Sequence, residues 1–351
     1  MDTRDTLAEQ LSLANDVTVS FESGIAVVTP KTKNDFRSLA SFAMKERERL
    51  GSLIRWSGAA VLRGFDVATA DEYTELTGAC LGYKAVTNRV LSALFSRAKR
   101  KTRGLGTYDL PPAKIQMQGP HTEAGWRSRR PRLITMWCEE APLEAGETAL
   151  FDMAAAYDSL DDDLKAYFDN FGSEYPVFGE KFVVDSVLIH PETKRRCLLL
   201  WYYESPLAQY AVAAYRETEH YRQNSIKETI PYTAINDATL AHTFCDGKKR
   251  VTLSEEQSIR LMRHVYKAAT YFKWQKNDVL IVDNIATGHG RMPCVPPRKI
   301  VVGYWNEVDT RPYGANPRVR TDDSPPLART GASPSYVVRV LANGLRGRLQ
   351  F

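Results

Sequence analysis

The chain has 351 residues, of which 43% are hydrophobic and 25% charged, with 47 Lys and Arg against 42 Asp and Glu. This composition is that of an ordinary globular protein long enough to bury a full core. No apolar run approaches the roughly 20 residues of a membrane-spanning helix, and the first residues lack the basic and apolar regions of a secretory signal. The composition therefore excludes a helical membrane protein and predicts a cytoplasmic enzyme or binding protein.

The net charge of +5 is confined to one end of the chain. Residues 311–351 contain seven Arg, no Lys and two Asp, so residues 1–310 balance at 40 positive against 40 negative side chains. Because nucleic-acid binding needs a basic face on a folded module, we expect no nucleic-acid partner. A second basic cluster, from Arg97 to Arg103, is interpreted as a solvated loop or helix end.

The five cysteines argue against a disulfide framework and against a structural zinc site. They are odd in number, far apart in the sequence, and form no C-x-x-C motif. Cys138 and Cys197 lie within apolar runs, so we expect small buried thiols in a reducing compartment.

The first part of the chain mixes predicted strands and helices. We expect a strand at residues 24–29 and a helix from Asn34 to about Leu50, closed by Gly51. A strand at residues 58–65 and a helix over about 70–81 follow.

The middle of the chain is richer in strands. A helical piece is predicted around residues 154–168, and Ser254 with Gln257 forms a capping box for a helix over 255–272. Aliphatic and aromatic runs predict strands at residues 132–138, 196–203, 279–284 and 300–307.

This order of elements indicates the fold class. Strands separated by long irregular connections, without strand–helix alternation, favour a β-sandwich or jelly roll with flanking helices over a Rossmann sheet. Residues 310–335 hold five prolines and are typical of an extended arm, and Tyr336–Leu345 is predicted as a short helix. We expect one jelly-roll domain over residues 1–310, with a helical N-terminal part, and a basic, proline-rich arm over 311–351.

The sequence has six histidines, which limits the number of candidate catalytic or metal-binding imidazoles. Four of them are expected at the surface or in local hydrogen bonds, namely His190, His220, His242 and His264. In an extended segment residues i and i+2 face the same way, so His121 and Glu123 direct an imidazole and a carboxylate at one point. His289 follows a buried-looking strand. Two histidines and one carboxylate on one face of a metal leave three positions open, the arrangement of non-haem Fe(II) oxygenases.

The sequence around these residues resembles the TauD/TfdA-type Fe(II)- and 2-oxoglutarate-dependent dioxygenases over roughly residues 55–307. The likeness rests on the motifs G-A-A-V-L-R-G-F, H-T-E, A-G-E-T and D-N-x4-H-G-R-x-P-x4-R. It is closer to the branch with H-x-E, which includes clavaminate synthase-like proteins and amino-acid hydroxylases of natural-product pathways. The resemblance implies a mainly β fold with flanking helices, the double-stranded β-helix or jelly roll.

The resemblance also implies roles for five residues. His121, Glu123 and His289 would bind Fe(II). Thr148 and Arg298 would bind the distal carboxylate of 2-oxoglutarate, for which the planar fork of arginine is suited. With O2, the reaction would yield succinate and CO2 and hydroxylate an unactivated C–H bond. Without the resemblance, Thr148 is interpreted as a β-branched strand residue and Arg298 as a surface arginine after a Pro-Pro turn.

Two positions narrow the expected chemistry. Glu123 stands where related halogenases have a small residue, so hydroxylation is favoured over halogenation, while desaturation or oxidative cyclisation stays open. Val302 stands where several family members carry an arginine for an acidic group of the substrate. This weakens a taurine-like substrate and favours one whose acid is masked or absent. The resemblance implies that the substrate is amino-acid-derived or another secondary metabolite. A thioester on an acidic carrier protein is one case, because the basic cluster at residues 97–103 suits such a carrier.

Candidates for contact with a small-molecule substrate are Gln118, Trp126 and Arg129, with Arg130 as an alternative to Arg129. Asn284 is expected to brace the turn before His289 rather than to touch substrate. The arm after residue 310 offers a surface for a second copy of the chain, and hence for a homo-oligomer. The rival hypothesis is a non-catalytic metal-binding jelly-roll sensor that uses the basic tail on nucleic acid.

Overall fold

The computed structural model of the chain describes residues 2–86, 102–104, 107–109, 117–177, 180–202, 207–224, 226, 242–247, 249–316 and 319. Most of the basic cluster at residues 97–103 and the helix predicted at 336–345 lie outside the described residues.

The described helices, in chain order, are α1 (Thr3–Ala14), α2 (Phe36–Lys45), α3 (Arg47–Ser57), α4 (Ala70–Glu75), the π-helical turn η1 (Leu76–Cys80), α6 (Met153–Ser159), α7 (Asp162–Asn170), α8 (Ala208–Arg216), α9 (Glu219–Gln223), α10 (Glu255–Lys267) and the 3-10 turn η2 (Arg311–Tyr313). The described strands are β1 (Val17–Glu22), β2 (Ile25–Pro30), β3 (Ala59–Leu62), β4 (Thr102–Gly104), β5 (Thr107–Asp109), β6 (Gln118–His121), β7 (Arg129–Glu140), β8 (Glu144–Ala145), β9 (Thr148–Asp152), β10 (Gly172–Val177), β11 (Glu180–Asp185), β12 (Val187–Ile189), β13 (Arg196–Leu198), β14 (Thr243–Cys245), β15 (Arg250–Thr252), β16 (Ala269–Phe272), β17 (Val279–Asp283), β18 (Thr287–Arg291), β19 (Cys294–Val295) and β20 (Lys299–Asp309).

Two sheets enclose the interior of the molecule. The larger has the strand order β1-β2-β3-β17-β7-β20-β5-β4, and the smaller has the order β16-β9-β18-β6. Apolar side chains from both sheets pack together between them, among them Met136 and Val302 from the larger sheet and Leu150 from the smaller. Two sheets that face each other across a shared core form the double-stranded β-helix, so the predicted fold class is confirmed.

The alternation of side chains along β7 shows which face is the interior. Ile134 and Met136 belong to the cluster between the sheets, whereas Leu133 and Trp137 belong to the cluster on the outer face. Successive side chains of a strand point to opposite faces, so both faces of this central strand are buried and its sequence is almost continuously apolar.

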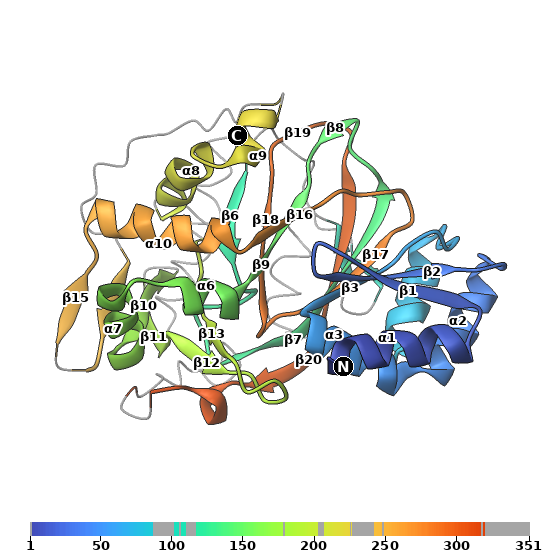
Figure 1. Cartoon of the computed structure of the whole chain (residues 1–351), viewed down its shortest axis with the longest axis horizontal. Coiled ribbons are helices and arrows are strands. Elements are labelled where there is room, and N and C mark those ends of the chain that lie inside the picture. The colour runs from blue at the N-terminus through green and yellow to red at the C-terminus, as the bar shows by residue number, and fades with distance from the viewer. Residues whose placement is uncertain are drawn as a thin grey trace, which may run out of the picture.

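Helices cover the outer faces of the two sheets. Figure 1 shows α1, α2 and α3 at one end of the molecule, beside β1 and β2, and α6, α8 and α10 at the opposite end, beyond the smaller sheet. Leu39, Leu53 and Ile54, from α2 and α3, pack on the outer face of the larger sheet. Phe151 of β9 and Met262 of α10 belong to the core on the other side. The smaller sheet is therefore held between the interior cluster and a layer of helices.

Several element boundaries differ from the sequence predictions. The helix expected over residues 34–50 is two helices, which meet at Glu46. Gly51 lies inside α3 rather than closing it. Gly58, at φ +78°, ends α3 instead, and an added Cβ there would approach Thr287 Oγ1 to 2.5 Å. Only glycine combines that positive φ with so close a neighbour.

Three further predictions were too long. Residues 154–168 form two helices, because Asp161 begins α7 as a separate N-cap after α6 ends. The capping box of Ser254 and Gln257 is confirmed, but α10 ends at Lys267 and β16 follows it. The strand expected at 196–203 is regular only over Arg196–Leu198.

All five cysteines are buried and free, which confirms the predicted burial of Cys138 and Cys197 and the prediction against a disulfide framework. Burial raises the pKa of the Cys138 thiol to about 12, which keeps it protonated and unreactive near neutral pH. In the described part of the chain, no helix combines the length and apolar character needed to cross a bilayer.

The core of β17 gives a test of this packing. Ile281 is 0% exposed, on the outer face of the larger sheet. Ile281→Ala is expected to lower the free energy of unfolding by about 2–5 kcal/mol, because it deletes buried methyl groups and leaves a cavity. Urea titration measures the change, with Leu13→Ala, at a side chain 79% exposed, as the control. Equal losses for the two variants would contradict the assigned core.

Candidate metal centre

Three side chains meet at the inner face of the smaller sheet. One ligand atom each from His121, Glu123 and His289 lies within 4.8 Å of the others. The two imidazole ring centroids are 4.2 Å apart and tilted by 50°. Two nitrogen donors and one carboxylate oxygen at this spacing suit a single divalent transition metal, Fe(II) among them.

Strand pairing brings the two histidines together. β18 lies between β6 and β9, and His289 is the cross-strand partner of His121 on one side and of Leu150 on the other. Directly paired residues face the same side of a sheet, so both imidazoles point into the interior with Leu150. Gly119, two residues before His121, has no room for a side chain, because an added Cβ would lie 2.3 Å from the Tyr202 carbonyl oxygen.

Hydrogen bonding fixes how His121 presents its nitrogens. Its Nδ1 lies 2.9 Å from the Gly119 carbonyl oxygen, which can only accept, so Nδ1 carries the proton and Nε2 keeps its lone pair. A backbone carbonyl on the second nitrogen is the usual way in which proteins orient a metal-binding histidine.

Both imidazoles are neutral near pH 7. Burial lowers the pKa of His121 to about 4. Burial, together with the proximity of His121, lowers the pKa of His289 well below its usual range. The Nδ1 atom of His289 is buried and forms no hydrogen bond with any described residue. Neutral imidazole is the form that binds a metal, so the donor set fits the ion.

Glu123 lies just beyond β6, in a turn closed by a hydrogen bond from the Gly125 N–H to the Thr122 carbonyl at 2.9 Å. Its backbone is held by Asn284, whose Oδ1 accepts the Glu123 N–H at 2.7 Å and whose Nδ2 donates to the Glu123 carbonyl at 3.0 Å. The sequence prediction that Asn284 braces its own turn is therefore incomplete, since the side chain reaches the loop that carries a candidate ligand.

A second polar group lies further along the same inner face. Arg298 is buried, and its Nε donates to the Gly146 carbonyl at 3.0 Å while Nη2 donates to Thr148 Oγ1 at 3.2 Å. Trp274 Nε1 also donates to Thr148 Oγ1, at 3.1 Å. Because the threonine oxygen accepts two N–H groups, its own proton is left to donate outward.

Burial and the nearby Arg291 lower the pKa of Arg298 to about 10, which still leaves it charged near pH 7. A buried guanidinium bound to one carbonyl and one hydroxyl is suited to a carboxylate ligand. Thr148 lies two residues along β9 from Leu150, the partner of His289, which places this candidate anion site roughly 7 Å along the sheet from the candidate metal centre.

The residues predicted to contact substrate differ in their burial and in the side chains that they contact. Gln118 is paired with Arg291, whereas His121 is paired with His289. Between these two pairs the chain advances by three residues in β6 and by two residues in β18. This register shift lies between Gln118 and His121, in the segment where the sequence prediction for Gln118 required a bulge at Pro120. It turns Gln118 toward the inner face.

Trp126 is partly buried, whereas Arg129 is exposed. The Trp126 ring packs on Phe182, with centroids 4.8 Å apart. The Arg129 side chain is 60% exposed, beside Glu307. Arg130 is fully buried, and its guanidinium contacts the hydroxyls of Thr122 and Thr310 at 3.5 and 3.4 Å.

Two of the four remaining histidines are not at the surface. His190 and His242 are fully buried, and each bonds a residue far away in the sequence: Asp283 at 3.1 Å and Ser173 at 3.0 Å. The prediction of surface or local roles was therefore wrong for His242 and incomplete for His190, which also accepts the Thr193 N–H. The contact of Trp274 with Thr148 was not predicted either, because no sequence motif indicates it.

The comparisons with known proteins agree with this geometry. A family model described as "Taurine catabolism dioxygenase TauD, TfdA family" matches residues 25–305. The dapdiamide synthesis protein DdaC of Enterobacter agglomerans is 23% identical over 285 residues, which cover 74% of this chain and 85% of DdaC. A clavaminate synthase-like protein of Arabidopsis thaliana is 23% identical over 291 residues, 73% of this chain and 84% of that protein.

Two solved structures of PvcB share the fold. One is described as an Fe, alpha-ketoglutarate dependent oxygenase from an isonitrile synthetic pathway, and the other is from Pseudomonas aeruginosa. Their TM-scores are 0.56 and 0.55, with 15% sequence identity, and they cover 85% and 86% of this chain and 95% of PvcB. At this identity the likeness establishes the jelly-roll architecture.

Co(II), which reports its coordination in its visible spectrum, tests the metal centre. The wild-type chain is expected to bind one Co(II), and His289→Ala is expected to weaken binding by more than about 100-fold, since losing an outer partner alone typically costs 10–100-fold. His264→Ala, at a partly exposed histidine beside Asp161, is the matched control. Equal affinity for wild type and His289→Ala would rule out this centre.

Proposed function

The chain belongs to the TauD/TfdA family of Fe(II)- and 2-oxoglutarate-dependent dioxygenases, and we propose that it hydroxylates an unactivated C–H bond of an amino-acid-derived or other secondary-metabolite substrate. In this proposal His121, Glu123 and His289 bind the iron, and Thr148 and Arg298 bind the distal carboxylate of 2-oxoglutarate. The observation that carries it is the convergence of the three ligand atoms within 4.8 Å on the inner face of the smaller sheet.

Iron and 2-oxoglutarate, when bound, supply the oxidation: O2 is consumed, the cosubstrate loses CO2 to become succinate, and one oxygen atom enters the substrate as a hydroxyl group. The residues of this chain supply binding and orientation. His121 offers Nε2 because Gly119 holds its Nδ1 proton. Arg298 offers charge and Thr148 a hydroxyl proton to the same carboxylate.

The interior between the sheets excludes water from this chemistry. Leu150 from the smaller sheet and Met136 and Val302 from the larger are each no more than 5% exposed, in one apolar cluster. A dry site strengthens the ionic contact between Arg298 and a carboxylate, and it protects a reactive oxidant from side reactions.

The relatives support a role in natural-product biosynthesis, because DdaC is named for dapdiamide synthesis and PvcB for an isonitrile pathway. Val302 is buried in the apolar cluster, so the position that carries a substrate-binding arginine in several family members offers no charge here. This supports a small-molecule substrate with a masked or absent acid. A carrier-bound thioester, a homo-oligomer and a cytoplasmic location stay predictions.

A desaturase or oxidative cyclase on the same scaffold is the alternative within the family, since both would use the same cofactors. The non-catalytic sensor is disfavoured by membership in a dioxygenase family.

The function is tested by incubating the Fe(II)-loaded protein with 2-oxoglutarate, O2 and a panel of amino acids and their amides and thioesters. Succinate is expected to form together with a product heavier by one oxygen atom. Arg298→Gln is expected to require roughly 10–100-fold more 2-oxoglutarate for the same rate, because a charge-assisted hydrogen bond contributes about 1.5–3 kcal/mol. Mass spectrometry and succinate assays measure both.

Arg222→Gln, at an exposed arginine paired with Glu219 on α9, is the charge-matched control. A product lighter by two hydrogens would favour the desaturase or cyclase. An unchanged requirement for 2-oxoglutarate in Arg298→Gln would contradict the role of Arg298, and no succinate from any compound, with or without carrier, would contradict the function.

A further inference from the structure

We propose that Asn284 is a positioning residue for the metal-facing carboxylate of Glu123. Its side-chain amide forms the hydrogen bonds with the Glu123 backbone that a neighbouring strand would otherwise form. The inference rests on the proposed role of Glu123 as an iron ligand. Asn284 itself touches neither of the two histidines in any described hydrogen bond, so it would act only through the backbone of Glu123.

Both polar atoms of the Asn284 side chain form hydrogen bonds with backbone groups. The side chain is 0% exposed. Its Oδ1 accepts the Glu123 N–H at 2.7 Å, and its Nδ2 donates to two carbonyl oxygens, those of Glu123 at 3.0 Å and Pro131 at 2.8 Å. One side chain therefore satisfies both backbone groups of Glu123. Only an amide supplies one acceptor and two donors in this arrangement.

The position of Glu123 explains why such a clamp is needed. β6 ends at His121, and Glu123 follows in a turn in which Ala124 has φ +53°. Among the described residues, no strand pairs with Glu123, whereas His121 is held in the β6–β18 ladder. A ligand in a turn has no sheet hydrogen bonds to fix its backbone, and the Asn284 amide provides both.

Asn284 is in turn fixed by the end of β17. Its backbone N–H donates to the Arg132 carbonyl at 2.9 Å. The preceding residue, Asp283, is fully buried, and its Oδ1 accepts the Ile285 N–H at 2.9 Å. Its Oδ2 accepts from Arg132 at 2.6 Å and from His190 Nε2 at 3.1 Å. The residues on both sides of Asn284 are thereby held in place.

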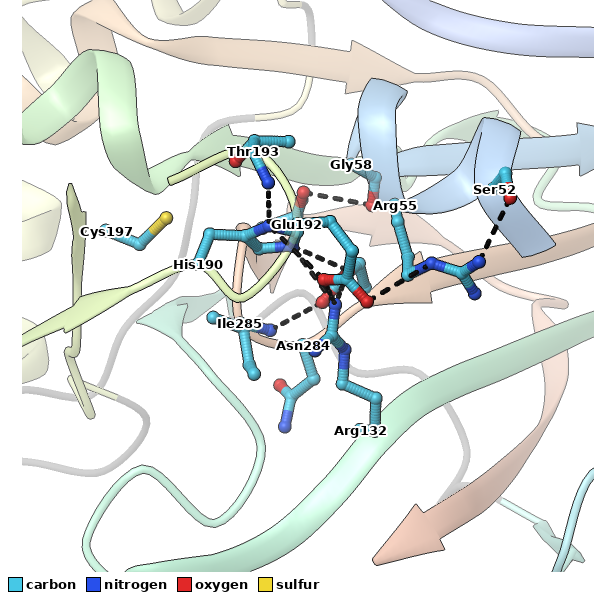
Figure 2. Close-up of polar contacts among 12 residues, drawn as sticks. Ser52, Arg55, Gly58, Arg132, His190, Glu192, Thr193, Cys197, Asn284 and Ile285 are labelled. Carbon is cyan, nitrogen blue, oxygen red and sulfur yellow. Dashed lines mark hydrogen bonds and ion pairs between the residues drawn. The ribbon is translucent and has the colours of Figure 1, made fainter. Parts of the chain in front are cut away.

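Figure 2 shows how this anchor extends outward from Asn284 and Ile285 to Arg132, His190, Glu192 and Arg55. His190 Nδ1 accepts the Thr193 N–H at 3.0 Å, which leaves its proton on Nε2 for Asp283. Glu192 links Arg132, at 3.1 Å, to Arg55 of α3, at 3.3 Å. The β12–β13 hairpin, β7 and α3 are therefore joined at the turn that carries Asn284.

Asn284→Ala removes the clamp and keeps all three candidate ligands. We expect the Kd for Fe(II), measured anaerobically, to rise by about 10–100-fold, as for the loss of other outer partners of metal ligands. The Co(II) spectrum should also change, because the carboxylate is no longer held in one orientation. At saturating Fe(II), the Kd for 2-oxoglutarate should stay at the wild-type value, because Arg298 and Thr148 are untouched.

Asn170→Ala is the matched control, since Asn170 is an exposed asparagine whose side chain, among the described residues, bonds the Ala166 carbonyl of its own helix and no other group. It should leave the Fe(II) affinity and the Co(II) spectrum unchanged. A folded Asn284→Ala protein with wild-type Fe(II) affinity and spectrum would overturn the inference alone. Failure of the wild-type protein to bind Fe(II) would overturn the proposed function and this inference with it.

A measurement on the wild-type chain decides the case if Asn284→Ala does not fold. The Glu123 amide, donating to a buried side chain, is expected to exchange its hydrogen slowly in the metal-free protein. Exchange at the rate of an exposed turn would overturn the clamp, and strong protection would support it.

Discussion

The antiparallel pairing of β6 with β18 is the interaction on which the rest of the site depends. It sets His121 opposite His289, and the bulge in β6 keeps Gln118 on the same inner face. β18 pairs on its other side with β9, which carries Thr148. Three strands that are not consecutive in the sequence thus place the candidate metal donors and the candidate anion site along one surface. Because register fixes side-chain direction, a slip of one residue would turn these groups outward.

The site concentrates groups that are costly to bury. Burial keeps both imidazoles neutral, and it leaves Arg298 charged without a salt bridge to any described carboxylate, although the nearby Glu147 favours the charged form. The apolar core between the sheets raises these costs, and bound metal and dicarboxylate would offset them. The charged cluster around Asp283 lies behind the site and is internally paired, which suits an anchor rather than a ligand pocket.

The local motifs allowed much of this to be predicted from the sequence. H-T-E and the D-N-x4-H-G-R run indicated the candidate metal donors, and the position of Arg298 after them indicated the candidate anion site. The structure then brought these residues together. Trp274 was missed because it reaches Thr148 only through the pairing of β16 with β9. Likewise, the contact of Asn284 with Glu123 and the burial of His190 depend on tertiary packing that no local pattern records.

The most direct test of the proposed site is a crystal structure of the protein with Mn(II) and 2-oxoglutarate, with the metal located by anomalous scattering. We expect one metal ion bound by His121, Glu123 and His289, and a 2-oxoglutarate whose distal carboxylate contacts Arg298 and Thr148. A metal ion bound elsewhere, or a distal carboxylate away from Arg298, would contradict it.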